Sequence, residues 1–331
     1  MKILVLGGAG YIGSHTVYRL IEQGNEVVIF DNLETGYIEA VHPKAKFYKG
    51  DLRNRVHIDS VLDVEKNIDA VIHFAANSLV GESMINPLKY YDNNLCGTKV
   101  LLESLVAHNI KNIVFSSTAA TYGEPKHTPI LEDDPTNPTN CYGETKKAME
   151  RMFYWTQQAH GLKYVSLRYF NACGAHISGK IGEAHNPETH LIPIILQAAN
   201  GTRDHISIFG TDYNTPDGTC IRDYIHVTDL AQAHILAVKY LLNGGESNIF
   251  NLGNGVGFSV REVIETAKKV TGKEIKVIEE ERRAGDPAIL IASSDKAKNI
   301  LGWKPEYDDL STIIETAWKW HSTHLNGYLS D

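Results

Sequence analysis

The chain has 331 residues, enough for one large core or two fused lobes; 43% of them are hydrophobic and 22% charged, as in ordinary globular proteins. Its formal net charge is -8 and its isoelectric point is about 6.0, and no run of lysine or arginine forms a polybasic arm. These properties argue against binding to DNA or RNA.

The N-terminus and the cysteines indicate the expected compartment. The first six residues are apolar, but Gly7 and Gly8 end this run far short of a signal-peptide core or a membrane span. We therefore expect a buried strand there and no membrane partner. Scattered cysteines without a CxxC pair predict free thiols and a cytoplasmic location. They are Cys96, Cys141, Cys173 and Cys220.

Fifteen histidines raise the question of a metal site. There is no HExxH motif. The His185/His190 and His321/His324 pairs lack the carboxylate or cysteine company that zinc sites usually show. The sequence therefore predicts no bound metal.

Up to about residue 170, short β-branched runs alternate with longer helical stretches, and the runs are nearly continuously apolar, as in strands buried on both faces. This pattern predicts an α/β fold with a doubly wound, Rossmann-like parallel sheet over residues 1–170. The expected strands are Lys2–Leu6, Glu26–Phe30, Lys46–Gly50, Ala70–Ala75, Asn112–Thr118 and Tyr164–Phe170. The expected helices are Ile12–Gln23, Arg53–Glu65, Leu88–His108 and Tyr142–Ala159.

The regular alternation is lost after residue 170. The segment 171–193 is rich in glycine, histidine and proline, and Gly210–Thr219 is a polar loop. Residues 171–331 are expected to form mainly a smaller substrate-binding lobe, interleaved with the first domain around a cleft. The elements expected here are helices at Thr228–Leu242, Ser259–Val270 and Leu310–His321 and strands at Ile206–Phe209 and Ile249–Leu252.

A glycine-rich loop, Gly7, Gly10 and Gly13, directly follows the first strand and begins a helix. In that position glycines allow a tight turn, close approach of the backbone to a pyrophosphate and close packing of the helix on the sheet. Asp31 ends the second strand, where its carboxylate would accept the adenosine ribose hydroxyls and repel a 2′-phosphate. The loop and the acid together predict bound NAD in preference to NADP.

Further polar positions follow other strands of the predicted sheet. Asp51 is placed to meet the adenine edge, and Phe74-Ala75-Ala76 follows the fourth strand where dinucleotides cross a doubly wound sheet. Taken singly, each would be an ordinary strand terminus, and they gain weight from the glycine loop.

Tyr142 and Lys146 are four residues apart, so both lie on one face of the expected helix. A phenol is a poor base at neutral pH because its pKa is about 10. Lowering that pKa by about three units requires roughly 4 kcal/mol, which the Lys146 ammonium and a cationic nicotinamide would supply. Thr118 ends the strand before this helix, beside Ser116, and its hydroxyl could relay a proton to Tyr142.

These residues stand among motifs that run from Met1 to the last helix: GGAGYIG, IHFAANSLVGES, PLKYYDNN, SSTAATYG, LRYFNACGAH, DGTCIRDYIHV and RRAGDP. The ordered set resembles the UDP-glucose 4-epimerase family, within the extended short-chain dehydrogenase/reductases. The resemblance implies bound NAD, a UDP-hexose substrate, and a homodimer formed by the helices near 88–108 and 141–160. It also implies a reaction in which Tyr142 takes the proton of the sugar 4-hydroxyl while the C4 hydride passes to NAD. The 4-keto sugar then turns, and the hydride returns to its other face.

The resemblance also implies a role for individual residues. The catalytic group would be Tyr142, Lys146 and Thr118. Cofactor contacts are expected from Gly7, Gly10, Tyr11, Ile12, Gly13, Asp31, Asn32, Asp51, Leu52, Phe74, Ala75, Ala76, Asn93, Ser116, Tyr142, Lys146 and Phe170. Contacts to the UDP-sugar are expected from Thr118, Asn171, His190, Leu191, Phe209, Arg222, Arg283, Asp286 and Leu290. The guanidinium groups suit a pyrophosphate, although either arginine taken alone would be interpreted as a surface ion pair with Asp223 or Asp286.

Three positions depart from the family pattern. Thr118 stands where many relatives have serine, and its methyl group restricts χ1. His190 stands where relatives often have asparagine. Leu290 is intermediate between the bulky tyrosine and small cysteine that relatives carry there, a difference linked to the acceptance of N-acetylated sugars, so that specificity stays open.

Other functions remain to be weighed against 4-epimerisation of UDP-glucose. A dehydratase needs an extra acid and base, and relatives with that activity carry Asp or Glu just after the catalytic Thr, where this chain has Ala119 and Ala120. Epimerases of UDP-GlcNAc, UDP-glucuronate or UDP-pentoses are harder to exclude. A non-catalytic NAD(H)-binding sensor could use the same fold, but such proteins tend to lose the tyrosine or the lysine.

Overall fold

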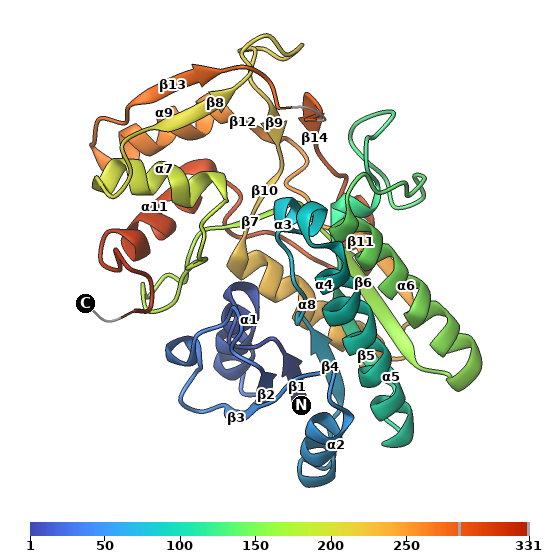
Figure 1. Ribbon diagram of the computed structural model, residues 1–331. Coiled ribbons are helices and arrows are strands. Elements are labelled where there is room, and N and C mark those ends of the chain that lie inside the picture. Colours follow the sequence, from blue (N-terminus) through green and yellow to red (C-terminus); the bar gives the residue numbers. More distant parts are fainter. Residues whose placement is uncertain (284–285, 330–331) are drawn as a thin grey trace.

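The computed structural model describes residues 1–283 and 286–329. Its largest sheet is entirely parallel, with the strand order β11-β6-β5-β4-β1-β2-β3 (Figure 1). The chain order reverses between β1 and β4, as expected for a doubly wound sheet. The strands are β1 (Lys2–Leu6), β2 (Glu26–Asp31), β3 (Lys46–Lys49), β4 (Ala70–His73), β5 (Asn112–Ser116), β6 (Lys163–Arg168) and β11 (Asn248–Asn251).

Helices cover both faces of this sheet (Figure 1). On one face, α1 (Tyr11–Glu22) and α8 (Val227–Leu242) pack against each other and on the strands. On the other lie α2 (Arg55–Val64), α5 (Gly97–Ala107) and α6 (Cys141–His160). Because both faces are covered, the strand side chains are buried in both directions, which explains their continuous apolar runs. The α/β, Rossmann-like fold expected from the sequence is confirmed.

The expected helix Leu88–His108 is interrupted. Three elements follow one another here: α4 (Pro87–Tyr90), the π-helical turn η2 (Tyr91–Cys96) and α5. Within the turn, Asn94 is fully buried and donates hydrogen bonds to the Asn77 carbonyl and the Thr145 hydroxyl, both at 3.1 Å. A π-turn of this kind rotates one side chain out of the helical register, often beside a functional site. The short helix α3 (Val80–Ile85) was not expected from the sequence.

A second core lies beyond the carboxyl ends of the strands, at the top of Figure 1. Buried side chains of α7 (Leu191–Asn200), α9 (Val260–Thr271) and α11 (Leu310–His321) form most of it. Its small sheets pair β10 (Tyr224–His226) with β7 (Asn171–Cys173), β13 (Val277–Glu280) with β8 (Ile206–Phe209), and β9 (Ile221–Arg222) with β12 (Phe258–Ser259) and β14 (Ile289–Leu290). The remaining elements are α10 (Asp295–Leu301) and the 3₁₀ turns η1 (Ile38–Ala40) and η3 (Ala119–Thr121).

Helix α7 was not expected from the sequence, where residues 171–193 are too rich in glycine, histidine and proline to predict an element. Pro193 is the third residue of α7, in the first turn, where the missing N–H has no intrahelical acceptor to lose. The helix ends at Gly201, whose φ of 83° gives a left-handed cap. Proline and glycine therefore mark the ends of a helix here, not a loop.

The two halves of the chain are interleaved. Both α8 and β11 come from the second half of the sequence, yet β11 pairs with β6 in the large sheet and α8 packs beside α1. The boundary at residue 170 remains a prediction. Among the residues described, no helix has the length and apolar character needed to cross a membrane.

Candidate active site

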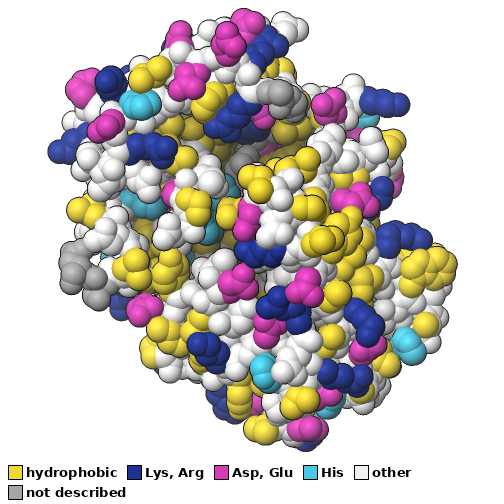
Figure 2. All heavy atoms as spheres, in the orientation of Figure 1, with side chains coloured by type: hydrophobic (Ala, Val, Ile, Leu, Met, Phe, Trp, Pro, Cys, Tyr) yellow, Lys and Arg dark blue, Asp and Glu magenta, His cyan; other side chains and the backbone are white. Residues whose placement is uncertain are grey.

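A cavity of about 1460 Å³ lies between the carboxyl ends of the parallel strands and the second core. Figure 2 shows the molecule hollowed at this junction. Such a crevice is where open α/β sheets bind their ligands. Its walls include the glycine loop, the end of β5, the first turn of α6, and Leu290 of β14 with Arg283, Asp286 and Pro287 before it.

The glycine loop has no room for a side chain at Gly7 or Gly13. Gly7 has a φ of 78°, and a Cβ there would lie 2.7 Å from the Ala75 backbone nitrogen. At Gly13 a Cβ would lie 2.0 Å from the Gly7 carbonyl oxygen. The loop therefore depends on glycine to turn tightly at the start of α1 and to present its backbone to the cavity. This geometry fits a dinucleotide pyrophosphate.

Asp31 supports this loop from the end of β2. Its carboxylate accepts hydrogen bonds from the backbone N–H groups of Ala9, at 2.9 Å, and Leu33, at 2.8 Å. Burial raises the pKa of Asp31, and these backbone donors oppose that rise. Each oxygen retains a further acceptor site, so the predicted contact with ribose hydroxyls is compatible with the fold.

Asp51 also lines the cavity, but Arg53 holds its carboxylate in an ion pair of 2.6 Å. Hydrogen bonds from the Arg53 side chain lower the pKa of Asp51, so it remains an acceptor. The predicted contact between Asp51 and adenine therefore has to share this carboxylate with Arg53.

Tyr142, Lys146 and Thr118 all border the cavity. Asn140 caps α6 by accepting a hydrogen bond from the Gly143 N–H at 2.8 Å, which places Tyr142 in the first turn. The Tyr142 N–H itself donates to Ser83 Oγ on α3 at 3.1 Å. Thr118 lies at the start of η3, so the end of β5 and the start of α6 face one space.

The Lys146 ammonium is directed at the sheet. Its Nζ donates to the Ser116 carbonyl at 2.7 Å and lies 5.8 Å from the centre of the Tyr142 ring. Burial lowers the pKa of Lys146 to about 7, against an opposing effect of Glu150. Burial also raises the pKa of Tyr142 to about 12, although a hydrogen bond from Thr118 opposes the rise. The protein's own groups leave the phenol pKa above its usual value, because the cost of burial exceeds the help of the hydrogen bond from Thr118. The lowering expected from Lys146 together with a cationic nicotinamide stays a prediction.

Most of the residues expected to contact the nucleotide-sugar line the same cavity: Asn171, His190, Arg222, Arg283, Asp286 and Leu290. Leu191 and Phe209 are absent from its lining. Leu191 packs against the second core, while the Phe209 ring lies 3.8 Å beneath the Arg283 guanidinium. Phe209 thus meets the cavity only through Arg283. Within the RRAGDP motif, residues 284 and 285 lie outside the described part of the chain.

Arg222 contacts the last two residues of the RRAGDP motif. It donates to the Pro287 carbonyl at 2.8 Å and forms an ion pair of 3.6 Å with Asp286. Asp223 is turned away from it and accepts from the Asn254 N–H at 2.6 Å. Burial raises the pKa of Asp223 to about 6. The ion pair considered for Arg222 therefore exists with Asp286, inside the cavity wall and not on an open surface.

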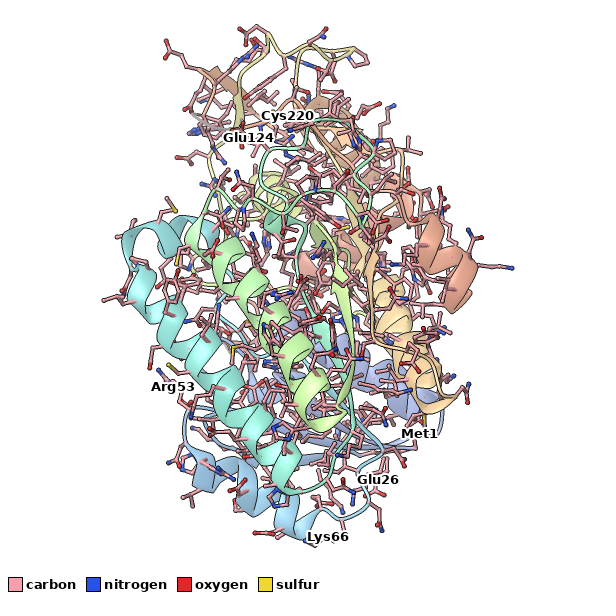
Figure 3. All side chains as sticks on the ribbon, turned by 90° about the vertical axis from the view of Figure 1, so that its right-hand side faces the viewer. Met1, Glu26, Arg53, Lys66, Glu124 and Cys220 are labelled. Carbon is pink, nitrogen blue, oxygen red and sulfur yellow. The ribbon has the colours of Figure 1, made fainter. Side chains whose placement is uncertain are left out.

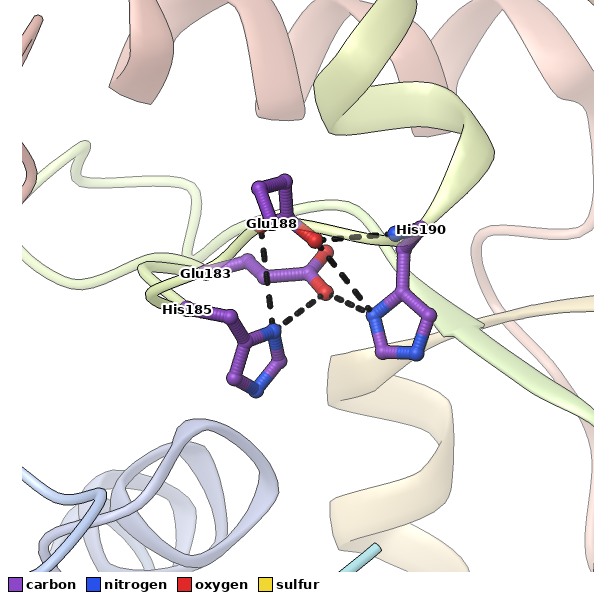
Figure 4. A group of neighbouring side chains, drawn as sticks. All are labelled: Glu183, His185, Glu188 and His190. Carbon is purple, nitrogen blue, oxygen red and sulfur yellow. Dashed lines mark hydrogen bonds and ion pairs between the residues drawn. The ribbon is translucent and has the colours of Figure 1, made fainter. Parts of the chain in front are cut away.

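The statement that His185 and His190 lack carboxylate company is wrong. Glu183 and Glu188 lie against both histidines, and His185, Glu188 and His190 line the cavity (Figure 4). The signal was present as two Glu-x-His pairs, at 183–185 and 188–190. Each histidine thus has an acid two residues before it, and spacing between histidines alone does not contain that signal.

Comparison with known proteins now identifies the family. The model of the NAD dependent epimerase/dehydratase family matches residues 3–253. The chain belongs to this family. The NAD dependence and the fold expected from the sequence agree with this membership.

The chain is 58% identical over 331 residues to a UDP-glucose 4-epimerase of Halalkalibacterium halodurans, covering 100% of this chain and 98% of the relative. A crystal structure of a UDP-glucose 4-epimerase matches with 55% identity and a TM-score of 0.98, covering 100% of both chains. The Bifidobacterium longum UDP-glucose 4-epimerase in complex with NAD+ and UDP matches with 39% identity and a TM-score of 0.93, covering 99% of this chain and 100% of that one.

The lowered pKa of Lys146 predicts a pH-dependent stability. Since its pKa falls from 10.5 to about 7 on folding, the nucleotide-free folded chain binds fewer protons than the unfolded chain between these values. The cost of burying this charge is complete below pH 7 and disappears as the pH rises to 10.5. The free energy of unfolding of Lys146→Met should therefore be higher than that of the wild type, and the difference should be largest near pH 7. That excess should shrink by a few kcal/mol toward high pH, at about 1.36 kcal/mol per pKa unit.

Urea unfolding of both proteins across this pH range measures the excess. Lys147→Met, which removes the neighbouring half-buried lysine of the same helix, controls for the loss of one positive charge. An excess that stays constant or grows with pH would contradict the assignment of a depressed pKa to Lys146.

Proposed function

We propose that this protein interconverts UDP-galactose and UDP-glucose, in galactose metabolism, by transient oxidation at the sugar C4. The observation that carries the proposal is that one cavity is bordered by the glycine loop, by Tyr142 with Thr118, and by Arg222 with Arg283. Dinucleotide, sugar and diphosphate would thus share one enclosed space. The relatives with the highest identity described above carry the name of this activity.

The chain's own groups divide the reaction between them. Bound NAD would supply the acceptor for the C4 hydride and, once reduced, the donor that returns it. Tyr142 takes the proton of the 4-hydroxyl and gives it back, and the Thr118 hydroxyl relays it. Lys146 positions the cofactor ribose and contributes positive charge near the phenol. A cavity of about 1460 Å³ would allow the 4-keto sugar to turn before the hydride returns to its opposite face.

The opposite wall would hold the UDP part. Arg222 and Arg283 suit a diphosphate because guanidinium groups form paired hydrogen bonds with its oxygens. Asn171, whose side chain already donates to the Asp223 carbonyl at 2.9 Å, would keep its oxygen for the ligand. In this arrangement Asp286 balances Arg222 until the diphosphate enters.

The cofactor contacts are also part of the proposal. Every cofactor contact expected from the sequence borders the cavity. Three of these residues, Gly7, Gly13 and Asp31, are additionally constrained by the loop geometry described above. Gly7 and Gly13 would hold the pyrophosphate, and Asp31 would hold the adenosine ribose.

We also propose a cytoplasmic homodimer formed along α5 and α6. Figure 3 shows these two helices side by side on one face of the molecule. Large apolar side chains near them are exposed, including Leu88 at 76% and Trp155 at 59%. Monomers rarely leave such groups uncovered in one region. Four free cysteines suit a reducing compartment.

Tyr142→Phe should lower kcat for conversion of UDP-glucose to UDP-galactose by about 10² to 10⁴-fold, because it removes the group that carries the proton. NAD binding should persist, since the ring remains. Tyr154→Phe, on the same helix and outside the cavity lining, is the matched control and should keep its turnover. Turnover is followed by chromatography of products from UDP-glucose, UDP-GlcNAc, UDP-glucuronate and UDP-xylose in parallel.

Near-normal turnover by Tyr142→Phe would refute its role as the base. Conversion of only one of the other three sugars would redirect the proposal to that substrate. Leu290, which lines the cavity, is the residue to vary in that case.

Sedimentation at micromolar concentration should give a dimer. Trp155→Glu should shift the protein toward monomer, because it places a charge in the proposed apolar contact. Val256→Glu, at a side chain 71% exposed in the second lobe, is the matched control and should remain dimeric. A wild type that is monomeric throughout, or an unaffected Trp155→Glu dimer, would reject this interface.

A further inference from the structure

Glu183, His185, Glu188 and His190 are collected into one cluster by the segment between β7 and α7 (Figure 4). One ligand atom from each residue lies within 4.8 Å of all the others. In the described part of the chain, no other group of histidines, cysteines and acids is gathered in this way. Within this quartet, His190 is an expected contact to the UDP-sugar, and the proposed epimerisation assigns no function to Glu183, His185 or Glu188.

The separations within the cluster are those of a coordination shell. His185 Nδ1 lies 3.1 Å from Glu183 Oε1 and 3.8 Å from Glu188 Oε2, and His190 Nδ1 lies 3.9 Å from Glu188 Oε1. Ligand bonds of 2.0 to 2.2 Å in a tetrahedral zinc site separate the ligand atoms by about 3.4 Å. Only the close contact between Glu183 and His190 would have to open.

His185 shows that the cluster does not fully satisfy its own polar groups. Its buried Nδ1 atom makes ion-pair contacts with Glu183 Oε1, at 3.1 Å, and Glu188 Oε2, at 3.8 Å, but neither contact has the geometry of a hydrogen bond. An unsatisfied buried nitrogen is costly and calls for a partner. A positive ion between the nitrogen and the carboxylates would satisfy all three groups.

The Glu188 carboxylate is already oriented by backbone N–H groups, and a buried indole holds the backbone of Glu183. Glu188 Oε1 accepts hydrogen bonds from the N–H groups of Thr189, at 2.8 Å, and His190, at 2.9 Å. The Glu183 carbonyl accepts from Trp320 Nε1 at 3.0 Å, and Trp320 is fully buried in the second lobe. Such outer contacts hold ligands in place and are characteristic of metal sites.

We propose that Glu183, His185, Glu188 and His190 bind one divalent transition-metal ion of the zinc type. Two imidazoles and two carboxylates favour such an ion over Mg²⁺ or Ca²⁺, which prefer oxygen-only shells. With both histidines neutral, the quartet has a charge of -2, which the ion neutralises. Four protein ligands describe a structural site, not a catalytic one with an open position.

The proposed metal site lies between the glycine loop and the start of α7. The His185 ring lies 6.2 Å from the ring of Tyr11, which lies within the glycine loop, and His190 directly precedes α7 at the cavity wall. The ion would therefore bind the segment 183–190 into a closed loop between the nucleotide-binding loop and the second lobe. It would hold the wall of the cavity on the side of α7.

The competing explanation is a network of protonated histidines paired with the two acids, which needs no ion. Tag-free protein stripped with a chelator and then titrated with Zn²⁺ separates the two. We expect one equivalent bound per chain and a rise in Tm. With Co²⁺ instead, the absorption spectrum should be that of a tetrahedral site without thiolate charge-transfer bands.

His185→Gln should weaken Zn²⁺ binding by more than about 100-fold and abolish the rise in Tm. His190→Gln, at a side chain 45% exposed, should do the same and gives a second variant that tolerates substitution. His127→Gln is the matched control, since His127 pairs with the single carboxylate of Asp134 at 3.0 Å, and it should bind as the wild type does.

Binding of much less than one equivalent by the wild type would overturn the site in favour of the protonated network. Unchanged binding by both cluster variants would also overturn it. So would a thiolate charge-transfer band in the Co²⁺ spectrum, because that band would show that cysteine binds the ion. None of these measurements depends on turnover, so the epimerase proposal and the metal site can fail independently.

Discussion

The hydrogen bond from the Lys146 ammonium to the Ser116 carbonyl joins helix α6 to the end of β5. A buried charge must be paired with a polar group, and Lys146 is paired with the end of the strand that leads to Thr118. The contact therefore fixes the first turn of α6 over the cavity, with Tyr142 one turn before the lysine. This hydrogen bond thus helps to hold the Tyr142 phenol and the Thr118 hydroxyl near each other.

The second lobe completes the site instead of adding a separate one. Its β-strands carry Arg222 and lead to Arg283, and α7 begins at the cavity wall. The two lobes are joined covalently several times because α8 and β11 return to the large sheet. This interleaving holds the arginine wall at a defined distance from the glycine loop. A net charge of -8 makes that positive wall a local feature of the surface.

The parts that could be predicted from sequence are those with a local cause. The turn at Gly7 to Gly13 and the one-turn spacing of Tyr142 and Lys146 are properties of short segments, and both have the expected geometry. The direction in which Lys146 points, the stacking of Phe209 under Arg283 and the Glu183 cluster arise from tertiary contacts. The periodicity of the sequence does not predict these features, although the repeated Glu-x-His spacing is a local signal for the cluster.

The central claim is that Tyr142 stays protonated in the protein alone and ionises only when positive charge is added beside it. Ultraviolet titration of wild type minus Tyr142→Phe, freed of nucleotide, measures this phenol directly. The account predicts a pKa of about 12 without nucleotide, a clear fall with NAD+, and a much smaller fall with NADH, whose ring is uncharged. A phenol that ionises near neutral pH without nucleotide, or equally with both forms, would contradict it.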